Sequence, residues 1–172
     1  MSDDAPFAWV ISTRAATEAI GIFLVIPPAH KTETDCLETQ DMAIRIVRLG
    51  SKRAEGEGLR IGTVRRPPRG VPKAEFGTHD YYDVWLPNLS PSASLVTQAK
   101  HAQQTGSQAE WNHFARSYRA EMNDSDTSKV LDLLAALSHS TDFSVGCYCE
   151  DESRCHRSIL RQLLSERGAL IK

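Results

Sequence analysis

Three stretches of the chain alternate apolar and polar positions with a period of two, which is typical of β-strands. In the first stretch Ile44 and Ile46 share one face, with polar or smaller residues between them. In the last stretch the same spacing continues from apolar residues into Cys147 and Cys149. The predicted strands span residues 42–50, 59–64 and 143–149.

Apolar positions spaced three and four residues apart predict helices in the middle of the chain. Ser90 and Pro91 have the form of an N-cap and a first helical residue, and they begin a helix that runs to about Gln104. Ser107 and Glu110 form a capping box ahead of a second, amphipathic helix. The apolar stripe of that helix comprises Trp111, Phe114, Ala115, Tyr118 and Met122.

Two more helices are predicted towards the end of the chain. Residues 124–126 break and recap the chain before one helix, and Gly168 sits where the C-terminal glycine of the other belongs. The apolar positions of the first are Val130, Leu133, Leu134 and Leu137. Those of the second are Ile159, Leu160, Leu163 and Leu164.

Strands at both ends of this segment, with helices between and after them, favour an α/β domain. We predict a single three-layer, Rossmann-like α/β domain with a mostly parallel sheet over residues 42–172. A pair of prolines and a polar run separate the preceding residues from this domain. We therefore interpret residues 1–41 as an N-terminal extension or accessory segment.

The composition of the 172-residue chain is that of an ordinary globular protein, with 41% apolar residues and a net charge of −2. No apolar run approaches the roughly 20 residues that span a bilayer, so we expect no membrane partner. Asp3 and Asp4 replace the positive start of a signal peptide. Three of the four cysteines lie within nine residues, unlike the spacing of small secreted scaffolds. We therefore predict a cytoplasmic protein with reduced thiols, whose oligomeric state the sequence leaves open.

The net charge conceals a basic segment at residues 45–73, where nine Lys or Arg face only two Glu. The segment ends in a proline-rich loop in which Gly70 permits a positive φ. The cations of this basic loop, residues 65–73, are Arg65, Arg66, Arg69 and Lys73. A stiff loop holds cations in place at small entropic cost, which suits an anionic ligand. The alternative is an ordinary solvated surface.

The predicted strand 143–149 leads through a polar loop into the triplet Cys155-His156-Arg157 and the last helix. This turn places the helix's first N–H groups and its positive dipole end at the carboxyl edge of the sheet. Open α/β sheets usually bind ligands there. The sequence therefore indicates a site at this turn, for which four interpretations remain open.

The first interpretation is an anion pocket made by backbone N–H groups and the side chains of Arg154 and Arg157, completed by the basic loop. The second is a nucleophilic or redox thiol at Cys155, whose pKa the helix dipole and Arg157 would lower. The third is a zinc site with the ligands Cys147, Cys149, Cys155 and His156. Against zinc, cysteines two apart on one strand face would lie about 6–7 Å from each other. The fourth is the packing of small buried residues.

Several motifs of residues 42–172 occur together in one known family. The basic loop reads Pro68-Arg69-Gly70-Val71-Pro72-Lys73, and Trp85 precedes Leu89-Ser90-Pro91-Ser92. The later motifs are Trp111, Phe114, Tyr118 and Glu121, then Cys149-Glu150 and Cys155-His156-Arg157. The combination resembles the bacterial family catalogued as domain of unknown function 488, including its YeaO-like branch. YeaO-like members usually carry a Trp before the Pro-Arg-Gly triplet, where this chain has Pro67-Pro68. The resemblance implies no established activity.

We predict that the protein binds a small anionic ligand such as a nucleotide or a phosphorylated metabolite, and we leave open whether it transforms that ligand. The predicted ligand-binding residues are Arg65, Arg66, Arg69, Lys73, Arg154 and Arg157. The candidate catalytic residues are Glu150, Cys155 and His156. We expect no cofactor and assign no metal ligand among the site residues. The alternatives are a nucleic-acid-associated accessory protein, whose phosphates the same cations would contact, and a non-catalytic interaction module.

Overall fold

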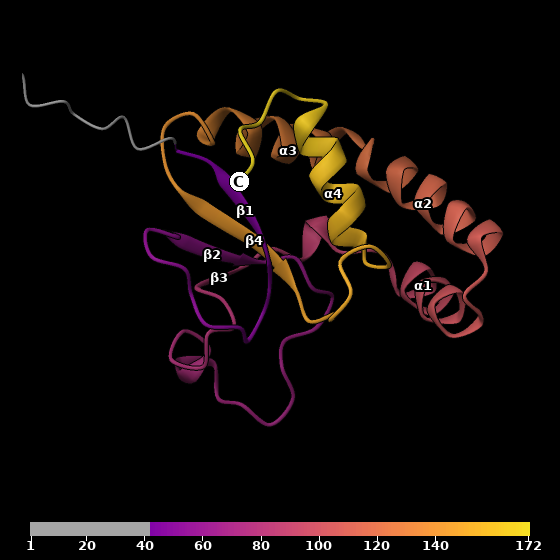
Figure 1. Ribbon diagram of the computed structural model, residues 1–172, viewed down its shortest axis with the longest axis horizontal. Helices are drawn as coiled ribbons and strands as arrows, with labels where there is room; N and C mark the ends of the chain where they lie inside the picture. The colour runs from indigo at the N-terminus through magenta and orange to yellow at the C-terminus, as the bar shows by residue number, and fades with distance from the viewer. Residues whose placement is uncertain (1–41) are drawn as a thin grey trace, which may run out of the picture. The chain divides into compact units, whose positions relative to one another are not determined.

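The computed structural model describes residues 42–172, which form four strands and four α-helices (Figure 1). The strands are β1 (Ile44–Arg48), β2 (Leu59–Gly62), β3 (Val84–Trp85) and β4 (Phe143–Cys147). The helices are α1 (Ala93–Thr105), α2 (Gln108–Met122), α3 (Ser125–Leu137) and α4 (His156–Ser165). The interpretation of residues 1–41 as an extension lies outside the described residues. Within the described range, no helix has the length and apolar character needed to cross a membrane.

The strands of this range form one parallel sheet in the order β1-β4-β2-β3. Although β4 is last in sequence, it lies between β1 and β2, and Val145 stands opposite both Ile46 and Ile61. A parallel sheet packed against α-helices confirms the predicted Rossmann-like α/β fold. Because the strands run in one direction, β1, β2 and β4 all end at the same side, which we call the carboxyl edge.

The helices cover one face of the sheet (Figure 1), and the main core lies between them. Ile44, Phe143 and Val145 from the sheet join Phe114 and Leu160 from the helices in this core, all nearly or completely buried. Alternate positions of β1 and β4 thus face the helices, as the period of two predicts.

Connecting segments close the opposite face of the sheet, and they approach it so closely that two strand positions are glycine. A Cβ atom at Gly62 would overlap the ring of Tyr82. A Cβ atom at Gly146 would lie 2.6 Å from Cδ2 of Leu49, well inside van der Waals contact. The sheet therefore lies between a layer of helices and a layer of loops.

Side-chain caps explain where the central helices begin. The hydroxyl of Ser107 accepts a hydrogen bond from the Glu110 N–H at 3.3 Å, which confirms the predicted start of α2. The expected N-cap of α1 is wrong by two residues. The hydroxyl of Ser90 donates instead to the carbonyl of Pro87, and Ser92 caps α1 by accepting from the Leu95 N–H.

Two apolar side chains of α3 lie on the opposite side from the one predicted. Leu131 and Leu134 are buried, whereas Leu133 is 58% exposed and Leu137 is 40% exposed. The apolar stripe is broad enough to fit either choice, and it is Leu131 that joins the main core. Trp85 in the short strand β3 is 45% exposed and lies outside the core.

An ion pair lies buried on the loop-covered side of the sheet. Arg60 on β2 is fully buried, and its Nε and Nη2 donate to the Glu57 carboxylate at 2.6 and 2.8 Å. Its Nη1 donates to the backbone carbonyls of Ser51 and Asp80. Glu57 also accepts the hydroxyl of Ser144 on β4 at 2.6 Å. Arg60, one of the nine cations of the basic segment, is therefore structural.

Acid is expected to weaken the fold through Glu57. Burial alone would raise the pKa of this carboxyl, but hydrogen bonds from Arg60 and Ser144 outweigh burial and lower the pKa from 4.5 to about 2. A carboxyl with a lowered folded-state pKa stabilises above its unfolded pKa. It therefore loses its contribution, about 3 kcal/mol, as the pH falls from about 4.5 towards about 2. Urea denaturation across this range measures the loss. The control is the double variant Arg60→Met/Glu57→Leu, and an equal acid loss in it would contradict the assignment.

Candidate functional site

Three thiols meet at the carboxyl edge. The chain leaves β4 at Cys147 and bends at Tyr148, which brings the Sγ atom of Cys149 to 3.7 Å from the Sγ atom of Cys147. Cys155 reaches the same place as the extended N-cap residue of α4. Its sulfur, the sulfur of Cys147 and a ring nitrogen of His156 all lie within 4.8 Å of one another. The strand predicted to run through Cys149 thus ends two residues earlier, and the bend makes these thiols neighbours.

The thiol cluster, which we define as Cys147, Cys149 and Cys155, is screened from solvent. Cys147 and Cys155 are 8% and 1% exposed, and Cys149 is half-buried. All three are free thiols. They pack against an apolar group just beyond the ends of β1 and β2. The buried members of that group are Leu49, Val64, Phe76 and Tyr82.

The neighbours of His156, the first residue of α4, fix its tautomer. Its Nε2 lies 2.9 Å from the carbonyl oxygen of Thr63, which can only accept a hydrogen bond, so Nε2 carries the proton. Nδ1 is therefore the acceptor nitrogen, and the S–H group of Cys155 donates to it at 3.7 Å. Burial lowers the pKa of His156 to about 4, so the ring is neutral at pH 7. The ring of Tyr118 packs edge-on against it, with centroids 5.6 Å apart.

The thiols share their protons unequally. Cys147 donates its S–H group to Cys149 and lowers the pKa of Cys149, and the neighbouring Cys155 and the positive charge of Arg157 act in the same direction. The pKa of Cys147 is raised in return. Cys147 lowers the pKa of Cys155, but the neighbouring Cys149 and burial outweigh this and raise the pKa of Cys155 to about 11. The lowered thiol pKa predicted for Cys155 therefore falls on Cys149.

Arg157 is a cation buried beside the thiol cluster, with 2% exposure. Its Nη2 donates to the carbonyl oxygen of Cys149 at 2.6 Å. Its Nε finds no hydrogen-bond partner within residues 42–172, and no carboxylate of that range forms a salt bridge with it. A buried guanidinium without a carboxylate favours negative charge nearby. The thiol cluster supplies the groups that can carry such a charge.

The basic loop and the β4–α4 loop line a common pocket of about 340 Å³. The two loops are far apart in sequence, and the ends of β2 and β4, which are adjacent in the sheet, bring them together. Gly70 takes a φ of +76°, as predicted for a turn in the basic loop. The pocket is lined by Arg66, Pro67, Pro68, Arg69, Tyr81 and Tyr148.

Tyrosine rings form the wall of this pocket. Tyr81 and Tyr148 pack edge-to-face with ring centroids 5.9 Å apart. The Tyr148 hydroxyl is buried and has no hydrogen-bond partner among the described residues, and the same holds for Tyr82. Burial and the neighbouring Tyr82 raise the pKa of Tyr148, so its hydroxyl stays neutral. The Tyr148 hydroxyl is therefore a neutral donor enclosed beside the pocket, without a partner among the described residues.

The remaining residues predicted to form the site lie apart from one another in the structure. Arg65 and Lys73 are exposed on the basic loop but do not line the pocket. Arg154 turns towards α2, where its guanidinium carbon lies 5.8 Å from the Trp111 ring centroid. The Glu150 side chain is 81% exposed and forms a surface ion pair with Arg48 at 2.9 Å. Catalytic roles for Glu150, Cys155 and His156 stay predictions.

Sequence reasoning missed Tyr81 and Tyr148 as pocket residues, and it missed Thr63 as the partner of His156. Tyr148 has a signal that points to it, because it stands between two cysteines at the end of a predicted strand. Thr63 has none, because its role depends on a backbone carbonyl, which every residue carries.

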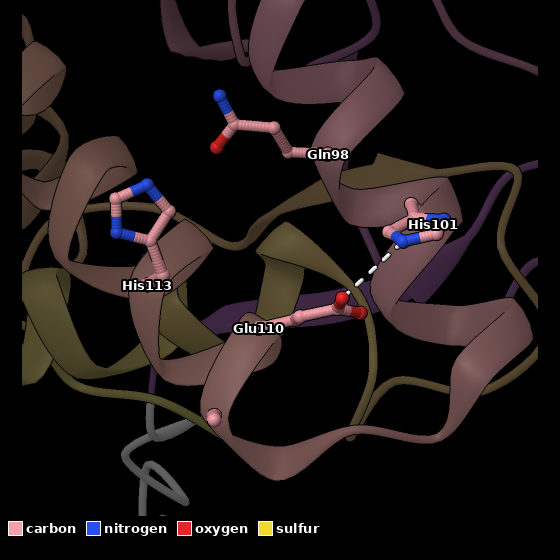
Figure 2. Close-up of a pocket in the computed structure, with 5 residues that line it drawn as sticks. Gln98, His101, Glu110 and His113 are labelled. Carbon is pink, nitrogen blue, oxygen red and sulfur yellow. Dashed lines mark ion pairs between the residues drawn. The ribbon is translucent and has the colours of Figure 1, made fainter.

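A second pocket, of about 500 Å³, lies between α1 and α2 (Figure 2). Gln98 and His101 on α1 lie across it from Glu110 and His113 on α2. His101 Nε2 lies 3.2 Å from Glu110 Oε1, but both side chains are largely exposed, so this ion pair contributes little to stability. The buried chemistry is at the carboxyl edge instead.

The fold and the site define an α/β protein with a parallel sheet, whose carboxyl edge joins a thiol cluster to a basic, aromatic pocket. The chain belongs to the DUF488 family: the model described as the active DUF488-N3 subclade matches residues 44–168. This finding confirms the family indicated by the sequence motifs. No curated protein and no solved structure matched the chain.

Proposed function

We propose that this protein binds a small anionic ligand, such as a nucleotide or a phosphorylated metabolite, in the pocket between the basic loop and the β4–α4 loop. One observation carries the proposal: Arg66 and Arg69 line the same pocket as Tyr81 and Tyr148. Guanidinium groups bind phosphate oxygens in a bidentate manner, and tyrosine rings offer flat apolar surface to a base or sugar.

The size of the pocket favours a small ligand over a polymer. Its volume of about 340 Å³ is at the lower end of the range of small-molecule sites. Arg66 and Arg69 are exposed and form no ion pair within the described residues, so they are available to a ligand. The loop that carries them is held by Val71, which packs against the apolar group beneath the thiol cluster.

Thermal unfolding in the presence of inorganic phosphate, nucleoside mono- and triphosphates and sugar phosphates tests the proposal. A ligand present at 100 times its Kd should stabilise the protein by about 2.7 kcal/mol. The double variant Arg66→Ala/Arg69→Ala should bind the ligand at least roughly tenfold more weakly, a loss of about 1.4 kcal/mol. Arg116→Ala, an exposed arginine on α2, is the matched control and should bind normally.

Two results would overturn this proposal. One is the absence of any stabilising ligand in the screen, and the other is equal affinity of the double variant and the wild type. A steep loss of affinity with salt would instead favour a nucleic acid, because binding a polyanion releases many counterions whereas a small ligand releases few.

We also propose that the protein lies in the cytoplasm of a bacterium. Three of its four cysteines lie within nine residues, which is unlike the spacing of small secreted scaffolds and supports a reducing compartment. Transformation of the ligand stays a prediction.

A further inference from the structure

We propose that Cys147, Cys149, Cys155 and His156 bind one zinc ion as a tetrahedral Cys₃His site. This inference goes beyond the proposed function, because it concerns the thiol cluster and not the pocket beside it. The four side chains come from the end of β4, the bend after it and the first turn of α4. No other group of three or more potential metal ligands occurs in the described part of the chain.

The spacing of the ligand atoms fits a tetrahedron around zinc. With Zn–S bonds of about 2.3 Å and Zn–N bonds of about 2.0–2.1 Å, the edges of a tetrahedral site measure about 3.5–3.8 Å. The Sγ atoms of Cys147 and Cys149 lie 3.7 Å apart, and Sγ of Cys155 lies 3.7 Å from Nδ1 of His156. The ligand atoms of Cys147, Cys155 and His156 are all within 4.8 Å of one another, and Cys149 joins this group through its 3.7 Å contact with Cys147. Movement of Cys149 towards Cys155 and His156 would complete the four-ligand site.

The histidine is already in the tautomer that a metal requires. Its Nε2–H donates to the carbonyl of Thr63 at 2.9 Å, which leaves the Nδ1 lone pair on the side of Cys155. Metal-bound histidines almost always donate their other ring N–H to a carbonyl or carboxylate in this way. The hydrogen bond therefore sets both the orientation of the ring and the nitrogen that would bind zinc.

Cys147 and Cys149 lie closer together than the sequence predicts. On one extended strand they would lie about 6–7 Å apart, which is too far for two ligands of one zinc ion. The strand β4 ends at Cys147, and the bend at Tyr148 folds the second thiol back over the first. The short Cys-x-Cys spacing therefore produces a close pair.

The electrostatic surroundings also suit a metal–thiolate site. Zinc with three thiolates and a neutral imidazole carries one net negative charge. Arg157 is 2% exposed, has an orphaned Nε and lacks a carboxylate partner within residues 42–172. Its cation offsets the charge of the loaded site. Because four protein ligands leave no open position and two of the thiols are buried, we assign a structural role to the zinc.

A zinc ion here would fasten the β4–α4 loop to the end of β4. Tyr148 lies between two of the ligands and lines the anion pocket, so the metal would hold one wall of that pocket in place. Without zinc, the loop is joined to its surroundings by contacts such as the Arg157 bond to the Cys149 carbonyl.

Metal titration of the wild-type full-length chain tests the proposal. The protein is reduced, freed of metal with a chelator under anaerobic conditions, and titrated with Co²⁺ and then Zn²⁺. We expect one equivalent of Co²⁺ to give thiolate-to-metal charge-transfer bands and the intense visible bands of tetrahedral coordination. One equivalent of Zn²⁺ should abolish both, since zinc prefers tetrahedral thiolate sites.

Serine variants of the individual thiols identify the ligands. Cys149→Ser and Cys155→Ser should each lower zinc affinity more than roughly 100-fold, because even outer-shell partners are worth about 10–100-fold. Cys36→Ser changes the remaining cysteine of the chain and should keep one tightly bound zinc per chain. Far-UV circular dichroism checks that each variant is folded, and the titration of the wild type stands without them.

The proposal is overturned if the reduced wild type binds no tetrahedral Co²⁺. It is also overturned if a folded Cys149→Ser variant keeps the affinity of the wild type. Zinc binding with no phosphate or nucleotide binding would refute the proposed function alone, because the two readouts use different ligands and different residues.

Discussion

Replacing Arg60 by methionine is expected to lower the free energy of unfolding by about 3–5 kcal/mol, the cost of breaking a buried ion pair from one side. The Glu57 carboxylate is 3% exposed and would lose both guanidinium bonds. Its remaining donors are the Ser144 hydroxyl and the Ala54 N–H, which carry no charge. Urea denaturation followed by circular dichroism measures the change.

Two controls show whether the loss arises from the orphaned charge. The double variant Arg60→Met/Glu57→Leu removes both partners, and it should recover most of the stability, since apolar replacement of a buried pair is often neutral. Arg53→Met breaks the partly exposed pair with Asp83, where the nitrogen–oxygen distance is 2.7 Å, and should cost about 1 kcal/mol or less. Equal losses in Arg60→Met and Arg53→Met would contradict this account of the network.

The basic segment shows where sequence reasoning succeeds and where it stops. The cluster of cations and the stiff loop were visible in the sequence, and Arg66 and Arg69 indeed line a pocket. Nothing local distinguished Arg60 from them. Its burial depends on the carboxylate of Glu57 and on carbonyls of segments that only the folded sheet brings together.

The turn between β4 and α4 lies where the sequence predicts it, but the positions of the thiols within it differ from the prediction. The turn after β4 was predicted from the strand–helix order, and parallel strands must end at one edge. The predicted distance between Cys147 and Cys149 was wrong because a strand ends where its pairing ends. The last residue pair between β1 and β4 is Arg48 with Cys147. Beyond that residue the backbone is free to bend, and two thiols two positions apart reach 3.7 Å.

The helices were predicted where local chemistry determines them. Ser107 and Glu110 form a cap within one turn, so the sequence alone places the start of α2. On α3, Leu133 and Leu131 are equally apolar, and the choice between them depends on packing against distant residues. The sequence therefore predicts that α3 forms, but tertiary contacts determine which of its sides is buried.

Replacing Gly58 by alanine is expected to destabilise the protein by about 2–5 kcal/mol. Gly58 precedes β2 with a φ of +70°, which costs an L-residue about 1–2 kcal/mol. Its added Cβ would also overlap the carbonyl oxygen of Asp142 and lie 2.8 Å from the carbonyl carbon. These are backbone atoms next to β4, so no side-chain rotation relieves the overlap, and forced packing of this kind costs about 1–3 kcal/mol more.

Gly56→Ala is the matched control, because Gly56 has nearly the same φ, +65°, with no atom within 4 Å of an added Cβ. Gly56→Ala should lower the free energy of unfolding by only about 1–2 kcal/mol, the cost of a positive φ at an alanine. The difference between the two variants then gives the cost of the clash at Gly58. Equal losses would show that the loop before β2 moves away from Asp142 freely.

Gly58 lies at the opposite end of β2 from the pocket, so folded Gly58→Ala should keep the phosphate response and zinc stoichiometry of the wild type. A Gly58→Ala protein that is folded but fails both would show that the two ends of the sheet are coupled through the register of β2 and β4.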